Sequence, residues 1–85
     1  MTRNQQIRHE CLLQLYGSGS VAISANQIVR RALRDGFGEL AHAEVKEALF
    51  FLEGQGFCAH RQEPATGEVR FRITSAGMLH YEANE

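Results

Sequence analysis

Two groups of arginine residues are the side chains in this sequence most suited to bind a ligand. Arg30, Arg31 and Arg34 follow closely on one another, and Arg70 and Arg72 alternate with apolar residues further along the chain. Guanidinium groups gathered in this way are what neutralisation of phosphates requires. A solvated arginine face that serves only solubility is the alternative interpretation. Which one applies depends on the elements that carry the arginines.

Catalytic and metal-binding signatures are missing from the sequence. It has no phosphate-cradling glycine loop with a Lys, no His-Glu-x-x-His and no Gly-x-Ser-x-Gly, and the Gly-Ser-Gly-Ser run at 17–20 is expected to be a turn. His9-x-Cys11 and Cys58-x-His60 pair possible metal ligands, but structural zinc sites use other spacings. We therefore expect two buried cysteines, no metal or other cofactor, and no enzymatic activity.

Length and composition favour one globular domain over residues 1–85. The chain is 44% hydrophobic and 22% charged, and its longest apolar run, at 48–52, is far shorter than the ~20 residues of a membrane span. The N-terminal residues are polar and no secretory apolar core follows them. These features predict a cytoplasmic protein with no membrane partner and no evident small-molecule substrate. The net charge of −1 makes the placement of the charges important, since phosphate-binding domains are often strongly basic.

Apolar residues at helical spacing predict helices over 4–16, 24–34, 39–53 and 76–83. In the second of these, Ser24 and Gln27 have the spacing of a capping box, and Ile28, Ala32 and Leu33 form part of the apolar face. Thr74 or Ser75 is expected to cap the last helix. In this arrangement the arginines at 30, 31 and 34 occupy the polar side of the second helix.

Residues with strand character lie at 21–23, 57–62 and 68–73. The last two are separated by Glu-Pro-Ala-Thr-Gly, which has turn chemistry, so they are expected to form a β-hairpin. Phe57 and Ala59 are expected to face the core, as are the apolar residues of the second strand. Arg70 and Arg72 then share the outer face, and Arg61 lies on the opposite strand.

The order helix, short strand, helix, tight turn, helix, hairpin, helix resembles the winged helix-turn-helix superfamily of small bacterial and phage DNA-binding regulators. The resemblance is carried by residues 45–57, Val-Lys-Glu-Ala-Leu-Phe-Phe-Leu-Glu-Gly-Gln-Gly-Phe, and by residues 71–77, Phe-Arg-Ile-Thr-Ser-Ala-Gly. It implies an α+β fold, mostly α, with a three-helix core, a β-hairpin wing and a short C-terminal helix.

The same resemblance implies a transcriptional regulator that binds double-stranded DNA. Residues 41–53 would be the recognition helix in a major groove, and the hairpin would touch the phosphate backbone or the minor groove. This function requires positive side chains from separate segments to converge on one surface. The expected DNA contacts are Arg30, Arg31, Arg34, His42, Lys46, Arg61, Arg70 and Arg72.

The third predicted helix fits this function poorly, which leaves a second hypothesis open. It carries Glu39, Glu44, Glu47 and Glu53 against Lys46 alone, and acids facing phosphates are repulsive. Phe50 is expected to project from its polar face, where a single exposed apolar residue needs no special explanation. The alternative is a protein-interaction module in which Glu47 and Phe50 contact a second copy or another protein.

Overall fold

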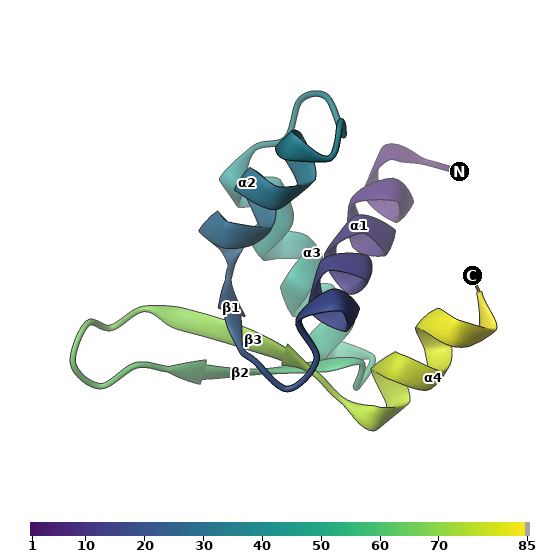
Figure 1. Cartoon of the computed structure of the whole chain (residues 1–85). Coiled ribbons are helices and arrows are strands. Elements are labelled where there is room, and N and C mark those ends of the chain that lie inside the picture. The colour runs from purple at the N-terminus through teal and green to yellow at the C-terminus, as the bar shows by residue number, and fades with distance from the viewer. Residues whose placement is uncertain (85) are drawn as a thin grey trace.

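The computed structural model describes residues 1–84, which form four helices and a three-stranded sheet (Figure 1). The order of elements confirms the predicted α+β, mostly helical, winged-helix architecture. The hairpin projects to one side of the helical body, and the last helix lies towards the other. The elements are α1 (Arg3–Ser18), β1 (Ile23–Ser24), α2 (Ala25–Arg34), α3 (His42–Gly54), β2 (Cys58–Gln62), β3 (Val69–Ile73) and α4 (Ser75–Ala83).

Side-chain caps fix the beginnings of three helices. Ser24 accepts a hydrogen bond from the backbone N–H of Gln27, whose side chain accepts from the Ser24 N–H at 2.9 Å, so the predicted capping box is confirmed. Thr2 caps α1 in the same way. Thr74, one of the two residues proposed, caps α4 through the N–H of Gly77.

Two helix boundaries differ from the prediction. α1 continues through Gly17 and Ser18, because the chain leaves the helical conformation only at Gly19, where φ is 60°. α3 begins at His42, not at residue 39, because Ala41 is extended, with φ of −90° and ψ of 146°, and forms the N-cap. The Glu44 carboxylate then accepts from the Ala41 N–H at 3.1 Å and so supports the first turn.

The sheet is antiparallel in the order β1-β3-β2, which places β3 in the centre. Phe71 pairs with Ile23 on one side and His60 on the other, and its side chain is 1% exposed. The expected phase of β2 was wrong: Cys58 faces the core and Ala59 is exposed. Pairing of Cys58 with the buried Ile73 sets this phase, because directly opposed residues lie on the same face of a sheet.

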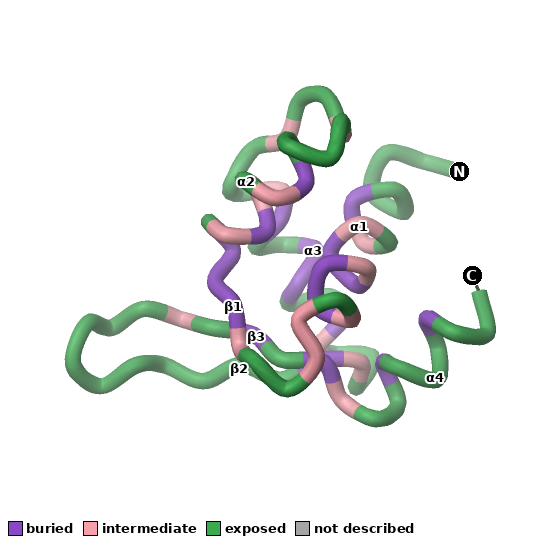
Figure 2. Tube along the Cα trace, viewed as in Figure 1, coloured by how far each residue is buried: buried purple, intermediate pink, exposed green. Residues whose placement is uncertain are grey.

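The core lies where α1, α2 and α3 meet one face of the sheet, whereas the distal half of the hairpin is exposed (Figure 2). Leu33, expected in the apolar face of α2, is 41% exposed, because that face is centred on Ile28 and Ala32. The largest fully buried side chains are those of Phe71, Ile7, Leu15, Ile23, Ile28, Leu49, Val45 and Cys11.

α4 is held against the start of β2 by close backbone contact. The Thr74 N–H donates to the Phe57 carbonyl at 3.1 Å, and the Thr74 hydroxyl donates to the Gly56 carbonyl at 2.6 Å. A Cβ atom on Gly77 would overlap the Phe57 carbonyl oxygen and press on Ile73. Glycine at position 77 is therefore required for the helix to approach this closely. None of the helices within residues 1–84 is long and apolar enough to cross a bilayer.

Candidate nucleic-acid interface

A surface hollow of about 270 Å³ lies between the start of α2, the first turns of α3 and the beginning of β3 with the turn before it. His42 and Lys46, one helical turn apart on α3, form one wall. Asn26 of α2 and the hairpin residues Gly67, Glu68 and Val69 border the other sides, and the Glu68 carboxylate is paired with Arg70. Lys46 is exposed and has no ion pair among the described residues, so its ammonium group is available to an anion.

Two of the acids of α3, Glu44 and Glu47, lie beside α1. Glu44 forms two hydrogen bonds with the Arg3 guanidinium, at 2.8 and 3.0 Å, and this pairing lowers the pKa of the carboxyl to about 2. Glu47 borders a small hollow with Arg8 and Asn4 of α1. The repulsion expected between this helix and phosphates is therefore smaller on the flank that carries Lys46.

Glu53 fastens the end of α3 to the hairpin. One of its carboxylate oxygens lies 2.6 Å from Nδ1 of His60 and accepts the His60 backbone N–H at 2.8 Å. Sequence reasoning did not find this contact, because the expected phase of β2 placed His60 on the outer face, whereas the structure pairs it with Phe71. α3 and the hairpin are thereby fixed relative to one another.

The three α2 arginines line a shallow hollow with Gln27, but they do not face the same way. At about 100° per residue, Arg30 is turned about 40° from Asn26, whereas Arg31 is turned about 140° from it. The Arg31 guanidinium donates to the Ser18 hydroxyl of α1 at 2.8 Å. Arg30 and Arg34 are exposed, and Arg34 lies 3.6 Å from the neighbouring Asp35. Arg30 is thus the member of this group nearest in direction to the Lys46 hollow.

The hairpin arginines share the outer face of the sheet. Arg61 and Arg70 are directly opposed, and Arg72 lies two residues further along β3, so all three project away from the core. Arg70 forms an ion pair with Glu68 at 2.7 Å, whereas Arg61 and Arg72 have no ion pair among the described residues. The sheet therefore carries a second basic surface.

Positive side chains thus lie in three places: the Lys46 hollow, the α2 arginines and the outer face of the hairpin. Among residues 1–84, no hydrogen bond, ion pair or common hollow joins Arg31 to Arg72. Their convergence on one surface stays a prediction.

Two aromatic side chains of α3 are partly exposed, on different flanks of the helix. Phe50 is 42% exposed, and its ring makes edge-on contacts with Phe71 and His60, with centroids 5.6 and 5.8 Å away. Phe51 is 43% exposed and carries the Arg8 guanidinium 3.5 Å from its ring centroid. Phe50 therefore packs over the junction of α3 with the sheet, and the rest of its ring is exposed to solvent.

Both cysteines are buried free thiols, as predicted. Burial raises the pKa of Cys11 and of Cys58 to about 12, so both stay protonated at neutral pH and are poor nucleophiles. Within residues 1–84, no group of three or more His, Cys, Asp and Glu side chains is arranged to hold a metal ion.

Comparison with known proteins finds similar solved structures, two of which are described below. No protein-family model matches the chain, and no curated protein matches it in sequence. The crystal structure of SSV1 F-93 is 25% identical, with a TM-score of 0.68, over 91% of this chain and 79% of that one. A transcriptional regulator from Clostridium thermocellum, Cth-833, is 18% identical, with a TM-score of 0.75, over 99% of this chain and 84% of its own. The order of elements and these likenesses together identify the chain as a member of the winged helix-turn-helix superfamily.

Proposed function

We propose that this protein is a transcriptional regulator that binds double-stranded DNA with the flank of α3 that faces the hairpin. The observation that carries the proposal is the separation of charge across α3. Lys46 and His42 border the hollow beside the hairpin, whereas Glu44 is paired with Arg3 on the other flank. An acidic helix can enter a major groove when its acids are directed away from the phosphates.

The shape of this region fits a duplex. A major groove admits one α-helix, and a hairpin beside that helix can reach the adjoining backbone. Lys46 is suited to guanine O6 and N7 or to a phosphate, and Asn26 at the first turn of α2 is suited to a phosphate. The Glu53–His60 contact holds the hairpin at a fixed distance from α3, so both elements meet the duplex as one rigid surface.

The arginines supply the sequence-independent part of the affinity in this proposal. Arg30 and Arg34 extend the surface along α2, and the arginines of the hairpin extend it along the sheet. Arg61 and Arg70 are directly opposed like charges, which destabilise a sheet unless an anion lies between them. Glu68 supplies one anion, and a DNA phosphate would supply another. Arg31, already bonded to Ser18, contributes the least.

A salt titration tests this proposal. Binding of genomic and random duplexes is measured by fluorescence anisotropy from low to physiological salt, for wild type, Lys46→Gln and Arg8→Gln. Arg8→Gln is the matched control, because it removes one positive charge of α1 that lies beside the opposite flank of α3. Affinity is expected to fall steeply with salt. Lys46→Gln is expected to weaken binding and to reduce the slope of log K against log salt by about 0.9, the value for one phosphate contact.

Absence of duplex binding by the wild type at low salt would exclude the proposal. Equal affinity of the Lys46→Gln variant and the wild type would exclude the assignment of this flank. If Arg8→Gln weakened binding as much as Lys46→Gln, the duplex would lie on the other side of α3.

Protein contact through Glu47 and Phe50 is the second candidate function. Both side chains are exposed on the outer side of α3, which favours it. Sedimentation velocity of the wild type and of Phe50→Asp decides whether a second copy binds there. A dimer that Phe50→Asp dissociates would support this function, and identical monomers would exclude self-association through Phe50.

A further inference from the structure

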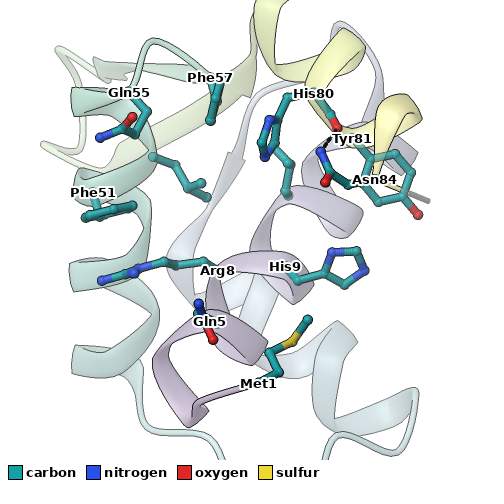
Figure 3. Close-up of a pocket in the computed structure, with 12 residues that line it drawn as sticks. Met1, Gln5, Arg8, His9, Phe51, Gln55, Phe57, His80, Tyr81 and Asn84 are labelled. Carbon is teal, nitrogen blue, oxygen red and sulfur yellow. Dashed lines mark hydrogen bonds between the residues drawn. The ribbon is translucent and has the colours of Figure 1, made fainter.

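A second, larger hollow is separate from the proposed DNA surface. It measures about 820 Å³ and lies between α1, the end of α3 and α4 (Figure 3). Phe51 and Leu52 of α3 line this hollow. Lys46 lies on the other flank of α3 and borders the smaller hollow of the proposed DNA surface. Its volume lies in the range of small-molecule sites, which are largely apolar and carry a few polar groups.

Aromatic rings form much of the wall. Phe57 stacks on His80 with ring centroids 4.2 Å apart. Tyr81 and Phe51 add further rings to the lining. Flat aromatic ligands gain most from such walls, because offset stacking adds to the burial of apolar surface.

Among residues 1–84, the polar side chains that line this hollow include one guanidinium and several amides, and no carboxylate. Nine Asp and Glu residues lie within residues 1–84, and none of these nine lines the hollow. Arg8 contributes a guanidinium, and the amide side chains of Gln5, Gln55 and Asn84 line other parts of the hollow. The lining therefore favours an anion over a cation or a neutral ligand.

Arg8 is positioned to bind a carboxylate. Figure 3 shows its side chain reaching from α1 to the Phe51 ring on α3, and the guanidinium lies 3.5 Å from the ring centroid. Stacking of this kind occupies the flat face of a guanidinium and leaves the N–H groups at its edge free. Arg8 forms no ion pair in the described chain. Glu44 and Glu47 border a smaller hollow with Arg8, but Glu44 is occupied by Arg3.

We propose that this hollow is a binding site for planar aromatic carboxylates of two or three fused rings. The carboxylate accepts two hydrogen bonds from the edge of the Arg8 guanidinium. The rings lie along the surface formed by Phe57 and His80. The site is independent of DNA binding, and its test requires no duplex.

The test uses 2-naphthoate and its uncharged analogue 2-naphthamide as probes. The chain has no tryptophan, so the fluorescence of the naphthalene ring reports binding directly. Wild type, Arg8→Gln and the matched control Lys46→Gln are titrated with each probe. We expect saturable binding of 2-naphthoate to the wild type and to Lys46→Gln, and at least about tenfold weaker binding of 2-naphthamide. Arg8→Gln is expected to abolish the difference between the two probes.

The difference between acid and amide within one variant is the decisive readout, because a partial loss of folding would weaken both probes alike. No saturable binding of 2-naphthoate to the wild type at millimolar concentrations would overturn the proposal. An Arg8→Gln variant that still preferred the acid would also overturn it. If sedimentation showed a wild-type dimer that did not bind the probe, a second copy would cover the hollow and the proposal would be wrong.

Discussion

Replacement of Gly77 by alanine tests how α4 is attached to the rest of the domain. The added Cβ would overlap the carbonyl oxygen of Phe57 and lie 2.8 Å from Cγ1 of Ile73. The first of these atoms belongs to the backbone and cannot rotate away. Alanine favours a helix over glycine by about 1 kcal/mol, whereas overpacking costs about 1–3 kcal/mol or more. The steric cost is therefore expected to win, with a net destabilisation of about 1–2 kcal/mol.

Gly17→Ala is the matched control, because Gly17 is also helical and a Cβ there meets nothing within 4 Å. Thermal and urea unfolding measure both variants against the wild type. A domain of this size loses about 4–8 °C in Tm for each kcal/mol, so Gly77→Ala is expected to melt clearly below the wild type. Gly17→Ala is expected to melt at or above it. Equal stability of the two variants would refute the argument that close approach requires glycine at 77.

Three further predictions concern single groups. Ser24→Ala removes the cap of α2 and is expected to cost about 1 kcal/mol in urea unfolding; an unchanged midpoint would contradict that role. Because the pKa of Glu44 in the folded protein lies at about 2, below its ordinary value of 4.5, its pairing with Arg3 stabilises the fold above pH 4.5. This contribution is lost as the pH falls towards 2. The stability difference between wild type and Glu44→Gln should therefore shrink over that range, and a constant difference would contradict the assignment. Cys11 and Cys58, with pKa values of about 12, are expected to react with a disulfide reagent at pH 8 only after unfolding; rapid reaction of the folded protein would show that they are not buried.

Local chemistry predicted much of the fold. The Ser24–Gln27 capping box and the Thr74 cap depend on neighbouring residues, so both could be read from spacing alone. The phase of β2 could not, because Phe57, Cys58 and Ala59 are all apolar and alternation alone does not choose between them. Pairing with β3 and the docking of α4 decide it, and these contacts join distant parts of the chain.

In the candidate site, too, local features could be predicted from the sequence and long-range contacts could not. Helical periodicity placed Lys46 on an exposed face, and the structure agrees. The partner of Glu44 is Arg3, which lies 41 residues away, so the sequence overstated the acidity of the exposed surface of α3. The direction of Arg31 was within reach of sequence reasoning, since rotation of about 100° per residue already separates it from Asn26. The aromatic hollow gathers α1, α3 and α4 and has no local signature.

An NMR titration of the labelled protein with a short duplex at low salt tests the central claim most directly. Binding by the hairpin-facing flank of α3 predicts that amide shifts change at Asn26, His42, Lys46 and Gly67, while those of Gln5 and Asn84 stay in place. Changes confined to α1 and α4, or none at all, would contradict it.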